Sequence, residues 1–367
     1  MRKHIYIAIL VVASLLLVGC QHEEVSPTTL AEEVEHQVRP YIVFGSRASV
    51  VVGTVRDGEE AVFAFGQKDF QTGEVPDRYT VYEIGSITKT FTGTLLAQMH
   101  LDQQVDLSDT IEQYLPSMKV PTYQDQSITL ESLATHTSSL PLLPSNQDEF
   151  VKEADNPYKY YTLEALYGFL NTYDLPRSVG SEFEYSNVGV DLLGHLLGRA
   201  DQSSYESAVT QKIITPLGLT NTTLSLSEAQ RENMAEPYKG KNVVSYWDAS
   251  EATQASGAII ADMNDMLRYL KTNMGLLPSP LYEAMTLAQA PRFAINERLS
   301  VGLNWFTTYE GEREILFHNG ATGGFDTFIG FDKDAQTGVV VLTNSSPTGG
   351  STTELGMDLL EVITNKY

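Results

Sequence analysis

The order of strand-like and helix-like patterns along the chain constrains its fold most. Residues 48–55 and 61–65 are rich in β-branched and aromatic side chains, and Asp57-Gly58 between them is a strong hairpin-turn signal. Helical spacing of apolar residues then dominates residues 91–281, and no long strand-like run interrupts it. An antiparallel sheet therefore begins early in the chain, and a large helical segment follows it.

Strand-like patterns return near the C-terminus. Three short runs are joined by glycine-containing turns, at residues 314–318, 325–331 and 339–344. Ser351-Thr-Thr-Glu354 is a capping box and predicts a last helix with one apolar face. We expect an α/β (α+β) fold in which both ends of the chain meet in one antiparallel sheet flanked by helices. A second, helical lobe over about residues 96–280 would leave a ligand site between the lobes.

The N-terminus has the pattern of an export signal. Arg2 and Lys3 precede an apolar run that is too short to span a bilayer comfortably, and the run ends in Leu17-Val18-Gly19-Cys20. Small residues before a cysteine resemble the lipobox of bacterial lipoproteins, in which the signal is cut before the cysteine and its thiol is lipidated. A plain secretory signal or a short uncleaved anchor is the alternative.

We therefore predict three parts of the chain. Residues 1–19 are a lipoprotein signal peptide, residues 20–40 are a lipidated, acidic tether, and residues 41–367 are the folded domain. Cys20 is the only cysteine, so it fits a lipid attachment site and excludes a disulfide within the chain. The lipid would hold the domain at the outer face of the cell membrane, or at the outer membrane facing the periplasm.

The composition and the absence of certain motifs exclude several classes of partner and site. The sequence has 24 basic and 47 acidic residues, and its formal charge of −23 would repel nucleic acid. No His-Glu-x-x-His motif or similar cluster is present, and neither is the Gly-x-Ser-x-Gly motif of the α/β-hydrolases. We expect no metal, no cofactor, no nucleic acid and a monomer.

Ser86-Ile-Thr-Lys89 is the first motif that suggests chemistry. If Ser86 opens the following helix, Lys89 lies three residues later on nearly the same face, within reach of the serine oxygen. A serine hydroxyl is a poor nucleophile until a neighbouring base takes its proton, and a helix N-terminus favours an oxyanion. The structural alternative is a capping serine followed by a solvated lysine.

Two further motifs follow in the chain. Tyr185-Ser-Asn187 precedes an apolar helical stretch, and it offers a hydroxyl that can move protons and an amide that can bind a carbonyl group. Core packing and helix capping are the alternatives for these two residues. His318-Asn-Gly320-Ala321 ends a predicted strand, where small residues would let an extended substrate lie against the backbone. On its own this run is an ordinary glycine-rich turn.

Together, in this order, the three motifs resemble the active-site motifs of the class C β-lactamase and D-alanyl-D-alanine carboxypeptidase family. Residues 133–141, LATHTSSLP, are similar to the family run LLTHTSGLP, and the resemblance covers residues 43–362. It implies a β-lactamase- and transpeptidase-like fold. Ser139 stands where that family run has glycine.

The resemblance also implies roles for individual residues. Ser86 would be the acylated nucleophile and Lys89 its partner. Tyr185 would carry protons, and Asn187 would bind the substrate and the lysine. The backbone N–H groups of Ser86 and Ala321, the residue after Gly320, would form the oxyanion hole.

His318 would occupy the motif position where many β-lactamases have lysine, similar to the His-Thr-Gly of some carboxypeptidases. A histidine usually titrates near pH 6.5, so if its cationic form helps to hold a substrate carboxylate, activity on anionic substrates should fall as the pH rises through its pKa. A hydrogen-bonding or structural role is the alternative.

The resemblance implies a serine hydrolase that acts on D-alanyl cell-wall peptides and reacts with β-lactams. Esterase activity, including D-alanyl ester hydrolysis, and β-lactamase activity are alternatives within the family. A penicillin-binding sensor or scaffold that acylates slowly is an alternative of another class.

Overall fold

The computed structural model describes residues 27–43, 45, 47–346 and 351–367. The predicted signal peptide over residues 1–19 and the predicted lipidation site, Cys20, lie outside the described residues. Within those ranges, no helix combines the length and the apolar character that crossing a membrane requires.

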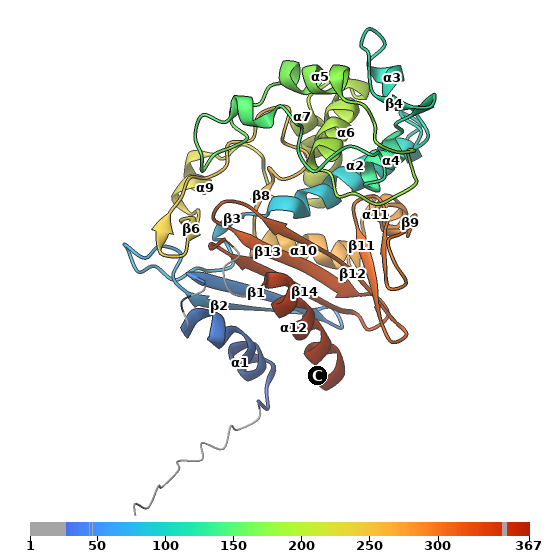
Figure 1. Cartoon of the computed structure of the whole chain (residues 1–367). Helices are drawn as coiled ribbons and strands as arrows, with labels where there is room; N and C mark the ends of the chain where they lie inside the picture. The colour runs from blue at the N-terminus through green and yellow to red at the C-terminus, as the bar shows by residue number, and fades with distance from the viewer. Residues whose placement is uncertain (1–26, 44, 46, 347–350) are drawn as a thin grey trace, which may run out of the picture.

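One antiparallel sheet joins the two ends of the chain, as the sequence predicts (Figure 1). Its order is β2-β1-β14-β13-β12-β11-β10-β9. The strands are β1 (Ser49–Arg56), β2 (Glu59–Gly66), β9 (Phe293–Ala294), β10 (Leu299–Val301), β11 (Phe306–Glu310), β12 (Arg313–Ala321), β13 (Asp326–Asp332) and β14 (Thr337–Thr343). The predicted fold class is confirmed.

The β1–β14 pairing closes the sheet between N-terminal and C-terminal segments. Its register runs from Val50 opposite Thr343 to Arg56 opposite Thr337. The predicted hairpin between β1 and β2 is also present, and Asp57 and Gly58 have φ of +51° and +85°. Two consecutive positive φ values are those of a type I′ turn, whose twist suits a two-residue hairpin.

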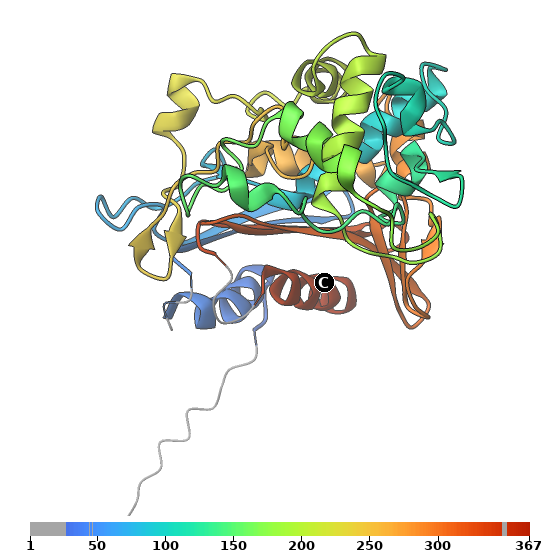
Figure 2. The same ribbon diagram turned by 45° about the horizontal axis from the view of Figure 1, so that its top comes forward.

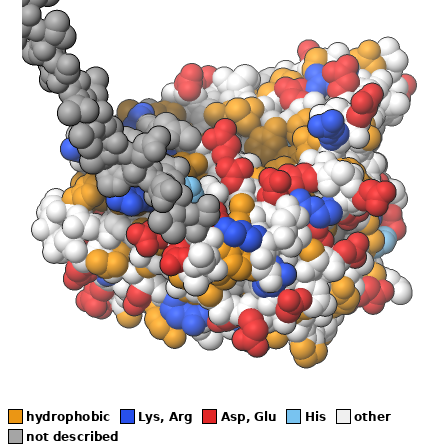
Figure 3. Space-filling model, turned by 90° about the horizontal axis from the view of Figure 1, so that it is seen from below, with side chains coloured by type: hydrophobic (Ala, Val, Ile, Leu, Met, Phe, Trp, Pro, Cys, Tyr) orange, Lys and Arg blue, Asp and Glu red, His pale blue; other side chains and the backbone are white. Residues whose placement is uncertain are grey.

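Two terminal helices cover one face of the sheet. Helices α1 (Leu30–Val43) and α12 (Thr352–Lys366) lie side by side beneath it (Figure 2). Ser351 caps α12 with the predicted capping box. Acidic, basic and apolar side chains are interspersed on the outer surface of this side (Figure 3).

The folded part begins earlier than the predicted boundary at residue 41. Val34 and Val38 of α1 are fully buried in the apolar cluster between the sheet and the terminal helices. A helix with two buried valines is part of the domain. The predicted tether over residues 20–40 is therefore too long, because α1 begins at Leu30.

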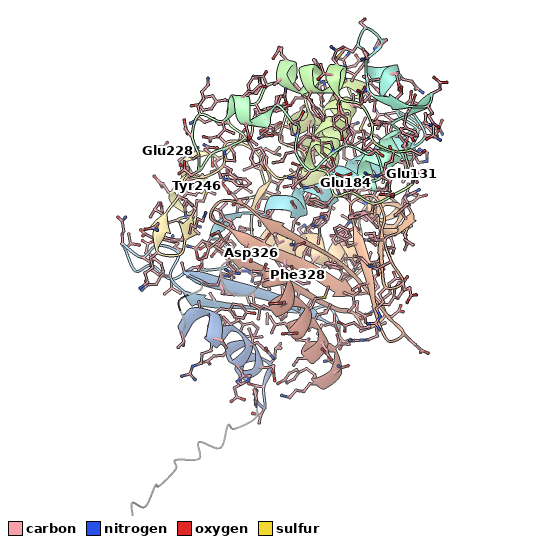
Figure 4. All side chains as sticks on the ribbon, in the orientation of Figure 1. Glu131, Glu184, Glu228, Tyr246, Asp326 and Phe328 are labelled. Carbon is pink, nitrogen blue, oxygen red and sulfur yellow. The ribbon has the colours of Figure 1, made fainter. Side chains whose placement is uncertain are left out.

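A buried ion pair fixes the terminal helices to the sheet. Arg47 donates to Asp326 at 2.7 Å, and both side chains are almost completely buried. Asp326 also accepts hydrogen bonds from the backbone N–H and the hydroxyl of Thr352, at the start of α12. Asp326 and Phe328 lie on the sheet near α12 (Figure 4), and Gly356 allows that helix to rest against the Phe328 ring. Arg47 and Asp326 thus compensate each other's charge in a buried position, where an unpaired charge would be costly.

The opposite face carries the helical lobe. Its main helices are α2 (Thr88–Leu101), α5 (Leu163–Thr172) and α6 (Asn187–Ala200). Shorter helical segments are α3 (Ile111–Tyr114), α4 (Leu130–Ala134), α7 (Tyr205–Val209), η3 (Thr210–Ile214), α8 (Thr215–Leu217) and α9 (Glu228–Glu232). A short hairpin, β4 (Thr122–Tyr123) with β5 (Gln126–Ser127), also belongs to this region. A second one, β6 (Tyr238–Lys239) with β7 (Asn242–Val243), lies at the end of β14, where Tyr238 bridges to Ser345.

The predicted lobe over residues 96–280 includes one helix that packs on the sheet instead. Met263 and Leu267 of α10 (Met263–Asn273) lie against Gly53 of β1, so α10 covers the main sheet. A small ladder between β3 (Val81–Glu83) and β8 (Ile260–Asp262) precedes it. Helix α11 (Tyr282–Gln289) packs against α2. The lobe therefore ends before α10.

Candidate active site

Ser86 and Lys89 lie together at the start of α2. Ser86 is in a 3₁₀ turn, η1 (Gly85–Ile87), that leads directly into the helix rather than in the helix itself. Lys89 Nζ donates to Ser86 Oγ at 2.9 Å and to the carbonyl oxygen of Ser256 at 2.7 Å. The lysine is completely buried, so its amine is held in one position. The predicted contact between the two side chains is present.

The Tyr185-Ser186-Asn187 segment reaches the same lysine. Lys89 Nζ lies 4.9 Å from the centroid of the Tyr185 ring. Ser186 caps α6, and its backbone N–H donates to Nδ1 of the buried His136. His136 therefore supports this segment. Glu184, labelled in Figure 4, precedes the segment in the chain.

Asn187 is the first residue of α6 and lines the same cavity as Ser86. Its side-chain oxygen Oδ1 is buried, and no group in the described part of the chain hydrogen-bonds to it. A buried amide oxygen without a partner is costly. Its position suits the predicted role of binding a substrate or the lysine.

Two glycines let the turn that carries Ser86 touch strand β12. A Cβ on Gly320 would lie 2.0 Å from the carbonyl oxygen of Ile84, and a Cβ on Gly85 would lie 2.7 Å from the backbone nitrogen of Ala321. Gly85 also has φ of +51°, which favours glycine. The backbone segments of Ser86 and Ala321, the predicted oxyanion-hole residues, are thus in direct contact. Gly320 allows the two backbone segments to lie this close together. It is not among the residues that line the cavity beside Ser86.

A cavity opens beside Ser86. Its lining includes residues of η1, α6, β12 and several loops: Glu83, Ser86, Tyr158, Asn187, Trp247, Ala249, Thr253, Ser256, Gly257, Ala258, Ile260 and Ala321. No lysine or arginine is among these described residues. The sequence motifs identified Ser86, Asn187 and Ala321 but gave no role to the others.

An aromatic wall forms one side of this cavity. The rings of Tyr158 and Trp247 meet edge to face with centroids 4.9 Å apart. Trp247 donates its indole N–H to the carbonyl oxygen of Asp155 and its backbone N–H to Glu83 Oε1, at 3.1 and 2.7 Å. Burial raises the pKa of Glu83 to about 7. No sequence motif identified the wall, because its two rings come from separate loops.

The surroundings of His318 disfavour its charged form. Its side chain is buried, it is absent from the cavity lining, and its ring lies 5.2 Å from the ring of Phe306. Burial and the nearby charge of Lys89 lower its pKa to about 3. Nδ1 lies 2.7 Å from the carbonyl oxygen of Asn319, to which it donates its proton. Burial thus disfavours the imidazolium form on which the predicted contact with a substrate carboxylate near pH 6.5 depends.

No metal centre is evident in the described ranges. No group of three or more His, Cys, Asp or Glu side chains there could hold a metal ion.

Comparison with known proteins gives a consistent result. The model of the Beta-lactamase family matches residues 34–362. D-alanyl-D-alanine-carboxypeptidase/endopeptidase AmpH of Escherichia coli K12 is 29% identical, with 94% of this chain and 92% of AmpH aligned. A β-lactamase of Pseudomonas fluorescens is 25% identical over 87% of this chain and 94% of its own length.

Solved structures share the fold. A class C β-lactamase superposes with a TM-score of 0.81 at 20% identity, covering 93% of this chain and 98% of its own. D-alanine carboxypeptidase AmpC from Burkholderia cenocepacia superposes with a TM-score of 0.78 at 21% identity, covering 90% and 98%.

Gly320→Ala should impair catalysis without unfolding the protein. The new methyl group would push β12 away from the turn that carries Ser86. We expect kcat/KM for a chromogenic ester to fall about 100-fold, as for a misplaced oxyanion donor. Gly168→Ala is the matched control, because its Cβ would meet nothing within 4 Å in the exposed face of α5. Equal kcat/KM in the two variants would contradict the proposed close approach.

His318 should make the protein sensitive to acid. Its pKa is lower in the folded state than in the unfolded chain, so the unfolded state binds the proton first as pH falls below 6.5. Between pH 6.5 and 5, this residue should remove about 2 kcal/mol from the free energy of unfolding.

In His318→Gln, urea unfolding at both pH values should show a correspondingly smaller loss. His36→Gln is the control at an exposed histidine. If the wild type and His318→Gln lose equal stability between pH 6.5 and 5, the pKa of His318 is not lowered in the folded protein.

Proposed function

The chain belongs to the Beta-lactamase family, and from that premise we propose that it is a serine hydrolase that forms an acyl-enzyme on Ser86 and acts on D-alanyl cell-wall peptides. The observation that carries this proposal is the 2.9 Å hydrogen bond from Lys89 Nζ to Ser86 Oγ beside an open cavity. The similarity to AmpH, named as a D-alanyl-D-alanine carboxypeptidase and endopeptidase, supports the choice of substrate.

The arrangement suggests the following reaction. Lys89, in its neutral form, takes the proton of Ser86 as the serine oxygen attacks the substrate carbonyl carbon. The backbone N–H groups of Ser86 and Ala321 stabilise the negative oxygen of the tetrahedral intermediate. The leaving amine, D-alanine in a carboxypeptidase substrate, departs with a proton delivered through Lys89 and Tyr185. Water then releases the acyl group and regenerates Ser86.

β-Lactams should enter the same reaction. Their strained amide carbonyl presents the same electrophile to Ser86, and opening of the ring leaves an acyl-enzyme of the same kind. Turnover then depends on how quickly water attacks that ester. The β-lactamase of Pseudomonas fluorescens among the relatives supports this part of the proposal.

Ester hydrolysis is the second candidate activity. The cavity has no lysine or arginine among its described lining residues, and the buried His318 is neutral at physiological pH. A cavity lining without a cation favours uncharged substrates such as neutral esters. The same nucleophile and oxyanion hole would serve both reactions.

We also propose that the enzyme acts as a lipid-anchored monomer outside the cell membrane, or at the outer membrane facing the periplasm. Support for the anchor comes from the sequence Leu17-Val18-Gly19-Cys20. A monomer is supported because the predicted catalytic and oxyanion groups all come from one chain.

One experiment tests the nucleophile and the substrate class together. The enzyme is incubated with D-alanyl-D-alanine peptides, a chromogenic β-lactam and short-chain esters, and turnover is compared with the mass of trapped enzyme. We expect one adduct on Ser86 with the mass of the opened β-lactam, and measurable release of D-alanine.

Ser86→Ala should lose turnover by at least about 1,000-fold, because it removes the group that is acylated. Ser138→Ala, in the neighbouring buried loop, is the control for a serine outside the proposed chemistry. Undiminished turnover in Ser86→Ala, or an adduct on another serine, would reject the proposal. Adduct formation without turnover of any substrate would instead indicate a penicillin-binding sensor.

The lipid anchor can be tested separately. A bacterial host that expresses the protein is fed an alkyne-labelled fatty acid, and the purified protein is probed for label. We expect label on the wild type and none on Cys20→Ala. Label that persists in Cys20→Ala would place the lipid elsewhere, and an unlabelled wild type would favour a plain export signal.

A further inference from the structure

A buried carboxylate, Asp191, is linked by hydrogen bonds to Lys89, the proposed catalytic base. Asp191 lies one turn after Asn187 in α6, and its side chain is 5% exposed. Its two oxygens accept the backbone N–H and the hydroxyl of Ser256, at 2.8 and 3.0 Å. The carbonyl oxygen of Ser256 in turn accepts from Lys89 Nζ. A continuous path of hydrogen bonds therefore runs from Asp191 through Ser256 to Lys89 and Ser86.

Asp191 does not cap a helix, as a buried aspartate often does. Buried aspartates such as Asp262 cap a helix, where the carboxylate accepts a backbone N–H of the first turn. Asp191 is in the interior of α6, where no free helical N–H is available. A buried carboxylate in such a place is costly unless a charge or hydrogen bonds compensate it. Here Ser256 and the charge of Lys89 do so.

The electrostatic surroundings of Asp191 point to the same lysine. Burial raises the pKa of Asp191 to about 7, and the charge of Lys89 and the bonds from Ser256 oppose that shift. The other titratable groups that interact with it are the hydroxyls of Tyr158, Tyr161 and Tyr205, whose pKa values are raised chiefly by burial. Lys89 is thus the cation that acts on this carboxylate.

Lys89 faces few other charges. The ring of Tyr185 lies beside its amine, and the buried His136 and His318 interact with it electrostatically. Both histidines have lowered pKa values because of burial and the charge of Lys89, and they are neutral at physiological pH. Asp191 is therefore the anionic group that the described residues present to this lysine.

We propose that Asp191 is a positioning residue for Lys89, which orients the amine through Ser256 and sets the pH range in which Lys89 can take the proton of Ser86. The ionised carboxylate favours the ammonium form of Lys89, because opposite charges stabilise each other in a site of low dielectric. Removal of this negative charge should therefore let Lys89 take the proton of Ser86 at lower pH. The inference rests on the proposed function, in which Lys89 is the base.

The test is the pH profile of acylation in Asp191→Asn. Asparagine has the same shape and can still accept from the Ser256 N–H, so the change removes mainly the charge. The substrate is p-nitrophenyl acetate, which does not ionise in the range studied. We expect the acid limb of the kcat/KM profile to move to lower pH by about one unit.

Asp262→Asn is the matched control, since it removes another buried carboxylate that bonds outside this path. Its acid limb should coincide with that of the wild type. Thermal unfolding shows whether each variant is folded, and Asp191→Ser serves as a smaller uncharged variant if the asparagine variant is not. An acid limb that stays in place in a folded Asp191 variant, with only a uniform loss of rate, overturns the proposal and leaves Asp191 a structural role. Failure of the proposed function would instead appear as unchanged turnover in Ser86→Ala.

Discussion

The backbone of the turn that carries Ser86 lies directly against the backbone of strand β12, and the proposed active site depends on this contact. Side chains at Gly85 or Gly320 would prevent it, because either Cβ would overlap backbone atoms of the other segment. The sheet makes the contact possible, since β1 pairs with β14 and so brings the early turn close to the late strands. The two predicted oxyanion residues, Ser86 and Ala321, are far apart in sequence and adjacent only in this fold.

The helical lobe contributes groups that act on the serine in the proposed reaction. Helix α2 supplies Lys89, α6 supplies Asn187 and Asp191, and the loop before β8 supplies the carbonyl oxygen of Ser256. Burial decides the charge of the ionisable groups around them. His136 and His318 are kept neutral, and burial raises the pKa of Asp191, which Ser256 links to Lys89, to about 7. The aromatic wall of Tyr158 and Trp247 then defines one side of the space open to a substrate.

Local patterns in the sequence predicted much of this. The Asp57-Gly58 hairpin and the Ser351 capping box depend on a few neighbouring residues, and both are present. Likewise, Ser86 and Lys89 are three residues apart, so a helical turn alone brings them together. The contacts made by Asp191 and Trp247 could not be predicted in this way, because their partners lie in distant segments of the chain.

The features that the sequence did not reveal also have tertiary causes. The charge of His318 depends on burial, which the motif does not reveal, and α1 belongs to the domain because its valines reach the sheet. Ser139, which replaces a family glycine, has φ of +65°, a left-handed conformation that favours glycine. The sequence showed that replacement but not the backbone conformation.

A crystal structure of the enzyme with a D-alanyl-like boronic acid would test the central claim most directly, because the boron mimics the tetrahedral intermediate. The account predicts a covalent bond from Ser86 Oγ to boron, with one boronate oxygen within about 3 Å of the backbone nitrogens of both Ser86 and Ala321. A bond to another residue, or a boronate oxygen that points away from these two nitrogens, would contradict it.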